Sequence, residues 1–571
     1  MVTLIKGRHV LHFGGEVLIN RADSTAWGNI NAGTMNFTGA YTESANGDAT
    51  TGVSYADFLL GYANSWSASV TPEYGGRLKI PQAFVQDDIK LKPTLTVNLG
   101  LRWQGMTGWH EVKNNMRTFD PTVTNTATNT LGALWFGTTK ANGRGSLQKP
   151  IWDMFMPRIG ASWQIRPDTV VRGGIGLYAY TWSIDTYGSG MGSELSSSGS
   201  LSDKTNGSLP VVLLDSDGTT NYQSSYGKSI ASAYTTSTTD PTALNGQDVG
   251  YGQYEMPVGK SLQWNLDVQH QITPNLSGEI AYVGNHGYDL PFDTDLNQVP
   301  ESKLSSNDAG DVPYTQYGKI DGRRPWGYAN YHSLQMSVDK RMSHDLQFNA
   351  NYVWSHMLDN ASSAGWNTYN GGSYWQRAYD PDANYGASNF DHRHVIKGSV
   401  IYTLPFGTGH VLSSNSRIVN EVISGWQPSV TVLAETGRPF TVYMATDISY
   451  SQTKNSSVQF PNMVGTWKKS NAGISGWYNV DAFEQPTAGT FGNNHRNNVY
   501  GPGMSQVNLS FGKMFSFTDK IKFQLRADAS NVLNHPSWGL PDQEIGDGHT
   551  ATIRSLSVGG RTMQIFGRLT F

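Results

Sequence analysis

The chain lacks cysteine, a strong net charge and long apolar runs. The absence of cysteine among its 571 residues excludes a disulfide framework and thiolate metal sites. The net charge of −4 gives no reason to expect nucleic acid as a partner. No apolar run reaches the roughly 18–20 residues of a spanning helix, which excludes a helical membrane protein. The start, MVTLIKGRHV, has too short an apolar stretch for a signal peptide.

Aromatic residues and glycine are abundant instead. The chain has 17 Trp, 28 Tyr, 21 Phe and 63 Gly, although only 38% of its residues are hydrophobic. A soluble β-sandwich seldom combines these properties. A membrane β-barrel combines them readily, because it carries aromatic belts at both membrane interfaces and encloses a wet interior.

Strict alternation of apolar and polar residues is the main pattern. In residues 95–104, LTVNLGLRWQ, the apolar side chains from Leu95 to Trp103 share one face and polar residues or glycine share the other. Membrane-spanning strands need about 9–11 residues, whereas strands of soluble proteins average about five or six. The pattern predicts an antiparallel transmembrane β-barrel wall of about 16 strands. Further strands are predicted at 9–19, 157–165, 171–180, 262–272, 521–530 and 561–571.

Short and long connections alternate along the chain. Tight turns are predicted at 92–94, 166–168, 273–275, 343–345 and 518–520. Long polar connections lie near 113–153, 182–258, 288–326, 359–390, 446–503 and 534–560. Outer-membrane barrels have short periplasmic turns and long extracellular loops. Residues 55–62 do not alternate, and we interpret them as a short helical or irregular connection on the periplasmic side. Residues 417–426 are interpreted as a second segment that includes such a connection.

Charged residues on the polar faces of strands are expected to point into the lumen, because charge toward lipid is costly. These lumen-facing candidates are Arg102, Arg158, Arg172, Asp267, Arg526 and Asp528. Tryptophans on the predicted strands are interpreted as belt residues that face lipid, namely Trp103, Trp163, Trp264, Trp354 and Trp426. Loop aromatics could stack on a ligand or pack the loops together, and the candidates for ligand contact are Trp182, Trp366 and Trp375.

Motifs for chemistry are weak. Two Gly-Lys-Ser triplets, at 227–229 and 259–261, lack the glycine that a phosphate loop has five residues before its Gly-Lys-Ser. His392 and His394 share a predicted strand face without a visible third ligand, and Asp215 and Asp217 lack the glutamate of a calcium loop. Neither G-x-S-x-G nor H-E-x-x-H occurs. We therefore assign no catalytic, cofactor or metal residue and predict that the protein is not an enzyme.

Several segments, in order along the chain, resemble the TonB-dependent outer-membrane transporters, and most of all the Oar-like proteins abundant in Acidobacteria. The series includes YADFLLG (55–61), FVQDDIKLKPTLTVNLGLRW (84–103), MPRIGASW (156–163), NFDHRHVIKGSVIYTLPFGTG (389–409) and FQLRADASNVLNHPSWG (523–539). The resemblance covers nearly the whole chain. No single segment is specific, whereas the ordered series is.

The resemblance implies a location in the outer membrane of a Gram-negative bacterium and the uptake of a scarce ligand. Family members have a signal peptide, a carboxypeptidase-regulatory-like domain and a plug before and within a barrel of about 22 strands. The match here begins at an internal barrel strand, so residues 1–571 are expected to be an N-terminally truncated barrel domain. The implied partners are outer-membrane lipid, the barrel-assembly machinery and, only through a plug that this chain lacks, the TonB complex. The alternative is a plug-less surface barrel that acts as an adhesin, receptor or porin.

The chain ends on an aromatic residue within a predicted strand, RTMQIFGRLTF. The resemblance implies that Leu569 and Phe571 are the signal read by the assembly machinery. The family usually has glycine where Phe566 stands and leucine where Gly567 stands. This departure is expected to weaken the signal or to bring a ring into the lumen. The transported substrate is not readable from the sequence, because fold does not fix function.

Overall fold

The computed structural model describes most of the chain. The described residues are 1–25, 34–45, 51–70, 73–184, 197–202, 212–213, 239–304, 311–362, 376–410, 412–451 and 459–571. Asp215, Asp217, Trp366 and Trp375 lie outside them.

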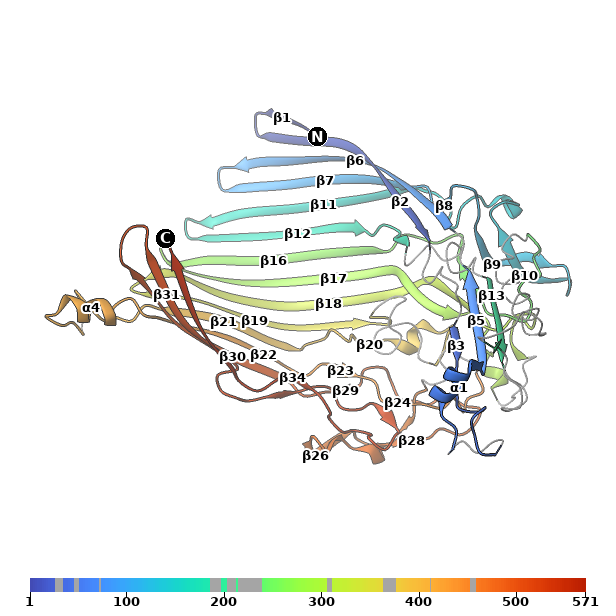
Figure 1. Ribbon diagram of the computed structural model, residues 1–571. Coiled ribbons are helices and arrows are strands. Elements are labelled where there is room, and N and C mark those ends of the chain that lie inside the picture. The colour runs from blue at the N-terminus through green and yellow to red at the C-terminus, as the bar shows by residue number, and fades with distance from the viewer. Residues whose placement is uncertain are drawn as a thin grey trace.

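One large, mainly antiparallel sheet forms the wall of the molecule (Figure 1). It contains 20 strands, and this number includes short strands at one end. Its long series of neighbouring strands follows the order of the chain, so each strand pairs with the one before it and the one after it. The series is β1 (Val2–Lys6), β2 (His9–Thr25), β6 (Glu73–Lys92), β7 (Leu95–Met106), β11 (Ile151–Arg166), β12 (Thr169–Ala179), β16 (Lys260–Thr273), β17 (Leu276–Asp295), β18 (Ile320–Ser343), β19 (Leu346–Asp359), β21 (His394–Tyr402), β22 (Gln427–Glu435), β30 (Met504–Ser516), β31 (Lys522–Ser530) and β35 (Thr562–Thr570).

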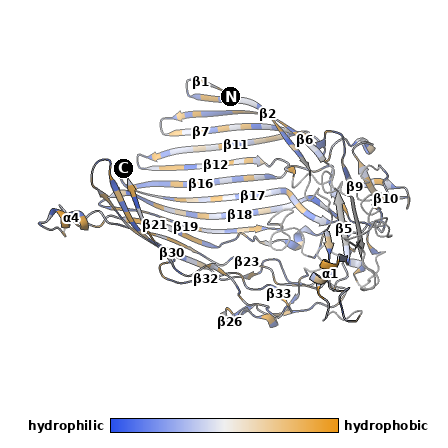
Figure 2. Ribbon diagram, viewed as in Figure 1, coloured by the Kyte–Doolittle hydropathy of each residue, from blue (hydrophilic) through white to orange (hydrophobic). Residues whose placement is uncertain are grey.

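The register keeps the two faces of this sheet distinct. Arg172 is opposite Asp267 and Val171 is opposite Val268, and directly opposed residues project to the same side of a sheet. Polar residues therefore line up with polar residues across strands, and apolar with apolar, as the alternating colours along the strands show (Figure 2). The strands predicted from alternation are confirmed. β1 was not predicted.

Short turns join the strands at one end of the sheet. The five predicted tight turns all fall between consecutive strands, and one further turn joins β1 to β2. In the turn between β18 and β19, His344 and Asp345 have φ of 51° and 59°, the left-handed backbone that a two-residue hairpin turn matching strand twist requires. Helix α4 (Arg417–Ile423), between β21 and β22, projects at this same end (Figure 1). A helix was one of the two conformations expected in this connection.

The long connections gather at the opposite end. Short strands of the large sheet lie there, namely β8 (His110–Glu111), β9 (Arg117–Asn125), β10 (Thr130–Phe136), β15 (Val249–Gly252) and β20 (Gly386–Ala387). The remaining strands form small separate sheets: β3 (Thr34–Asn36), β5 (Ser65–Val70) and β13 (Ser197–Ser202); β4 (Tyr62–Ala63) and β14 (Val212–Leu213); β23 (Pro439–Phe440) and β29 (Val499–Tyr500); β24 (Tyr443–Met444) and β33 (Glu544–Ile545); β25 (Asn462–Met463) and β28 (Phe483–Glu484); β26 (Lys468–Gly473) and β27 (Gly476–Tyr478); β32 (Ser537–Trp538) and β34 (Leu556–Val558).

Helix α1 (Ser54–Leu60) corrects one expectation about topology. Its residues are helical, one of the two conformations predicted, but the helix lies among the long connections and not at the end with the tight turns (Figure 1). The reason is chain direction. β2 runs away from the turn that joins it to β1, so the segment that follows β2 starts at the far end.

The buried core lies under the long connections and not in the middle of the wall. The largest cluster is built around Trp109, Trp135 and Trp182, and Trp109 Nε1 donates to the Trp182 carbonyl over 2.9 Å. The nearby Arg144 guanidinium pairs with Asp120 at 3.0 Å and lies over the Trp135 ring. Burial lowers the pKa of Arg144, and Asp120 opposes this shift. These contacts fix the long connections as ordered structure above the wall.

The two outer edges of the sheet remain apart in the described residues. β1 pairs only with β2, and β35 pairs only with β31, so no described pairing joins the last strand to the first. In the part of the chain that the structure describes, no helix has the length and apolar character to cross a membrane.

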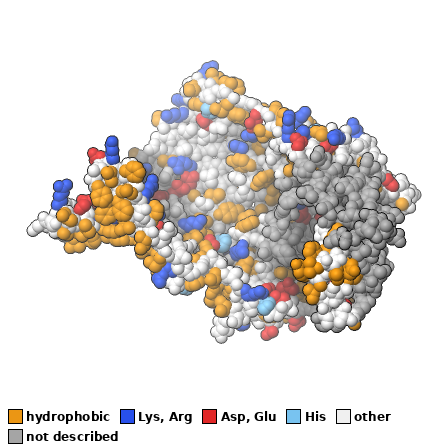
Figure 3. All heavy atoms as spheres, viewed as in Figure 1, with side chains coloured by type: hydrophobic (Ala, Val, Ile, Leu, Met, Phe, Trp, Pro, Cys, Tyr) orange, Lys and Arg blue, Asp and Glu red, His pale blue; other side chains and the backbone are white. Residues whose placement is uncertain are grey.

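Helix α4 exposes apolar side chains. Ile418 is 77% exposed and Val422 is 53% exposed. In the space-filling view, apolar atoms cover much of the projecting part of the molecule to which α4 belongs (Figure 3).

Candidate functional site

Charged side chains on the polar face of the sheet pair with one another. Arg172 Nη1 lies 3.6 Å from Asp267 Oδ1, across β12 and β16. Arg526 Nη2 lies 2.9 Å from Asp528 Oδ2 on β31. In the first pair Arg172 is exposed and Asp267 is largely buried. The second pair is more exposed, and such pairs contribute about 0–1 kcal/mol to stability. Their main effect is therefore to balance charge along a polar wall.

Arg102 and Arg158 lie on the same polar face. Arg102 Nη2 is 2.9 Å from Glu16 Oε1, which belongs to a strand two positions away in the sheet. Arg158 has glycine opposite it on both sides, Gly100 on β7 and Gly176 on β12. The missing side chains leave room for the guanidinium to lie over the Tyr178 ring, 4.4 Å from its centroid.

A shallow groove of about 470 Å³ lies beside Arg158, and we call it the glycine groove. The polar-face residues that line it are Gln86, Asn98, Gly100, Arg158, Gly160, Gly174, Gly176, Tyr178, Gln263 and Asn265. A Cβ added to Gly176 would lie 3.2 Å from both Arg158 Cγ and the Tyr178 ring. The groove and the Arg158–Tyr178 contact thus depend on the same glycine.

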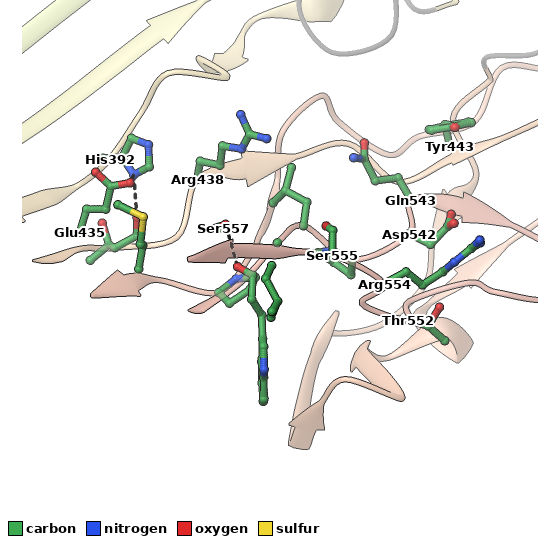
Figure 4. Close-up of a pocket in the computed structure, with 18 residues that line it drawn as sticks. His392, Glu435, Arg438, Tyr443, Asp542, Gln543, Thr552, Arg554, Ser555 and Ser557 are labelled. Atoms are coloured by element: carbon green, nitrogen blue, oxygen red, sulfur yellow. Dashed lines mark hydrogen bonds and ion pairs between the residues drawn. The ribbon is translucent and has the colours of Figure 1, made fainter. Parts of the chain in front are cut away.

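A larger pocket of about 860 Å³ lies at the end with the long connections (Figure 4). We call it the rim pocket. It forms where the ends of β22 and β30 meet two connections, residues 436–443 and 538–557. Its polar and charged lining residues are His392, Glu435, Thr436, Arg438, Tyr443, Asp542, Gln543, Thr552, Arg554, Ser555 and Ser557.

Hydrogen bonds and one close histidine–carboxylate contact position part of this lining. His392 Nδ1 is 2.8 Å from the Thr436 carbonyl oxygen and 3.8 Å from Glu435 Oε1. Ser557 Oγ donates to the Trp538 carbonyl over 3.0 Å. Arg438 and Arg554 come from different connections, and both side chains are exposed. Guanidinium groups bind carboxylates, phosphates and sulfates through paired hydrogen bonds, so the pocket has the donors to hold an anionic group.

The two histidines considered as metal ligands have separate partners. His392 contacts Thr436 and Glu435, whereas His394 Nδ1 is 2.8 Å from the Tyr352 hydroxyl. Within the described ranges, His, Asp and Glu side chains form no group of three or more that could hold a metal ion.

The aromatic candidates take different positions. Trp163 and Trp354 are each more than half exposed on the apolar face. Trp264 lies against Gly284 of β17, where any Cβ would overlap its ring. Trp182 is 1% exposed and belongs to the core under the long connections, so in this conformation it packs those connections together.

The last strand places its side chains on alternate faces. Phe566 is opposite Arg526 on the polar face, and its ring centroid is 5.6 Å from the guanidinium carbon. Leu569 and Phe571 are 58% and 94% exposed. The family departure at position 566 therefore places a ring beside an arginine.

Sequence reasoning missed the rim pocket. Its residues are distant in the chain, and neither Arg438 nor Arg554 lies on a strand that alternation predicts. The available signal was weak: one arginine in the polar connection before β30 and one in the polar connection before β35.

A large antiparallel sheet with one apolar and one polar face, short turns at one end and long connections at the other defines an outer-membrane β-barrel protein. The chain belongs to the outer membrane beta barrel domain family, whose model matches residues 1–564. It is a protein of the outer membrane of Gram-negative bacteria. No curated protein matches the chain.

Several solved structures of transporters are similar to this chain. The outer membrane transporter YddB from Escherichia coli has a TM-score of 0.50 and 12% identity, over 100% of this chain and 53% of that chain. The FrpB iron transporter from Neisseria meningitidis (F5-1 variant) has a TM-score of 0.43 and 9% identity, over 99% and 54%. The copper transporter OprC has a TM-score of 0.43 and 8% identity, over 99% and 55%. The chain thus spans about half the length of these transporters. At 12% identity, the likeness to YddB supports the fold alone.

Proposed function

We propose that residues 1–571 form the barrel domain of a TonB-dependent transporter of the Oar-like kind, which takes up a scarce ligand such as an oligosaccharide, a peptide or a siderophore. The observation that carries the proposal is the two-faced wall, with paired charges on one face and apolar side chains on the other. In this proposal the polar face lines the lumen and the apolar face contacts lipid. Arg102, Arg158, Arg172, Asp267, Arg526 and Asp528 are then lumen residues.

Transport in this proposal needs no bond to break in the ligand. The long connections capture the ligand, and TonB acts on a plug inside the barrel rather than on the wall. Differential binding in the closed and open states then drives release. The barrel-assembly machinery recognises the strand that ends with Leu569 and Phe571.

The rim pocket is the proposed first contact for the ligand. It lies among the long connections, which outer-membrane barrels place outside the cell. Its two exposed arginines favour a ligand that carries a carboxylate, phosphate or sulfate group. Trp366 and Trp375, outside the described residues, remain proposed ligand contacts.

Uptake by intact cells tests the function. A strain that lacks the gene is complemented with the natural protein, with the double variant R438A/R554A or with the control variant K113A, which removes a cation from an exposed site. Growth is measured on single acidic and neutral oligosaccharides, on peptides and on ferric siderophores. We expect one ligand class to require the protein and TonB, and R438A/R554A to need at least about tenfold more of it.

Two outcomes contradict the proposal. Uptake that continues unchanged after loss of TonB identifies a porin. Loss of surface attachment without any loss of uptake identifies an adhesin.

A further inference from the structure

Helix α4 and the wall beneath it form a surface that the transport proposal does not use. The helix divides sharply into two faces. Ile418, Val419, Val422 and Ile423 fall on one side at 100° per residue, whereas Arg417, Asn420, Glu421 and Ser424 fall on the other. Buried apolar contacts do not explain the first face, because Ile418, Val419 and Val422 are 77%, 43% and 53% exposed.

The apolar face of the sheet holds the C-terminal end of α4. Lys513 of β30 donates from Nζ to the carbonyl oxygens of Glu421 and, over 3.1 Å, of Val422. Trp426 Nε1 donates to the Val422 carbonyl over 2.9 Å. The last carbonyls of a helix lack partners within the helix and attract cations, so these two donors fix the helix in place.

Lys513 and Trp426 belong to the same face as the lipid-facing side chains. Lys513 is opposite Leu525, and the register places it on the face away from Arg526 and Asp528. The Trp426 ring stacks on Phe511 with centroids 4.7 Å apart. The C-terminal end of α4 is therefore continuous with the apolar face of the wall, and Trp426 and Lys513 lie where the helix meets the wall.

The far end of the helix segment is also constrained. Asn420 closes the start of the segment through two hydrogen bonds with the Ser414 backbone, at 2.7 Å and 2.6 Å. Ser416 caps the helix by accepting from the Val419 amide over 3.4 Å. The apolar side chains are consequently presented by an ordered element.

We propose that α4 is an interfacial anchor, which inserts Ile418, Val419 and Val422 into the periplasmic leaflet of the outer membrane at the boundary between phospholipid headgroups and acyl chains. The occupant is lipid because the surface continues the lipid-facing wall and lies at the end with the tight turns, which barrels place in the periplasm. A two-faced helix with an apolar side and a charged side lies in the plane of such a boundary. The inference rests on the membrane location and is independent of the transported ligand.

Site-specific labelling tests this anchor. The chain has no natural cysteine, so a thiol-reactive label attaches only at the introduced cysteine. I418C and V422C are each labelled with an NBD fluorophore in the full chain, purified from outer membranes and reconstituted in phosphatidylethanolamine–phosphatidylglycerol vesicles. N415C, an exposed polar position before the helix, is the matched control. Nitroxide-labelled phosphatidylcholine should quench the labels at 418 and 422 at least about threefold more than the label at 415. Aqueous iodide should show the reverse order.

A second variant tests whether the fixed position of the helix is what brings its side chains into contact with lipid. K513M removes one of the two donors that hold the helix end, and we expect lipid quenching at 418 to fall toward the value at 415. Folding of every variant is checked by its heat-dependent mobility on a gel. Equal iodide quenching at 415 and 418 would place the helix in water and overturn the proposal. Protection from both quenchers would place a protein on the surface, and this also overturns it.

Discussion

The Arg496 guanidinium contacts the carboxylate of Asp359, and both side chains are only 1% exposed. Arg496 lies in the long connection between β22 and β30, and Asp359 ends β19. The same guanidinium donates to the Asn384 carbonyl over 2.8 Å and to Ser362 Oγ over 3.1 Å. One buried side chain therefore joins the connection between β22 and β30 to the end of β19 and to the connection that follows it. The Asp359 carboxylate neutralises the Arg496 charge, which makes the burial of that charge tolerable.

Replacing Arg496 by methionine should loosen this connection. The variant leaves the Asp359 carboxylate buried without its cation, a change that costs about 3–5 kcal/mol. We expect faster cleavage within residues 446–503 by a protease added to intact cells. K469M, an exposed substitution in the same connection, should leave the cleavage rate unchanged. Equal cleavage of both variants would show that Arg496 does not hold the connection.

The orientation of the wall predicts which sites are reachable from outside the cell. Lys113 lies in a long connection and Lys520 lies in a tight turn, and both are exposed. A membrane-impermeant maleimide should label K113C on intact cells. It should label K520C only after the outer membrane is permeabilised. The opposite result would invert the assignment of the two ends.

Valine in place of Gly176 should displace Arg158 from Tyr178. A Cβ at this position already lies 3.2 Å from both partners, and the two methyl groups of valine crowd them further. Overpacking of this kind costs about 1–3 kcal/mol. The measurement is the temperature at which the folded band on a gel is lost, with G145A as the control because its Cβ meets no atom within 4 Å. If both variants melt alike, the glycine groove tolerates a side chain.

The two phenylalanines of the last strand should behave differently. F571S is expected to reduce the amount of assembled protein strongly, because Phe571 belongs to the proposed assembly signal. F566G removes only the contact with Arg526, and such cation–π contacts contribute about 0.5–1 kcal/mol at exposed sites. Quantifying folded protein in outer-membrane fractions at equal synthesis distinguishes the two. Comparable losses would contradict the assignment of the signal to Phe571.

The wall was predictable because alternation is a local property. The patterns around Leu95–Trp103 and Leu262–Val268 state which face each residue occupies, and the register of β7 and β16 agrees with them. The turns at 343–345 and 273–275 are equally local, because each joins two consecutive strands. The predicted position of α1 was wrong, because a helical segment does not by its own residues show at which end of the sheet it lies.

The rim pocket was not predictable for a different reason. Arg438 and Arg554 line the same pocket only because β22, β30 and the long connections pack together. The same holds for Arg496 and Asp359, which are 137 residues apart. Long-range packing of irregular segments produces no periodic pattern in a sequence. A strand with one apolar and one polar environment does, because its residues alternate between the two faces.

The glycine groove has a consequence for anything that moves along the wall. Lysine, arginine and glutamine have long side chains with many rotamers. Such a side chain loses conformational entropy each time it becomes ordered on a ligand. Gly100, Gly160, Gly174 and Gly176 have no such freedom to lose. In the proposed transporter these four positions offer a passing molecule backbone of fixed shape, so contact there orders no side chain, whereas Arg158, Gln86 and Gln263 line the rest of the same groove.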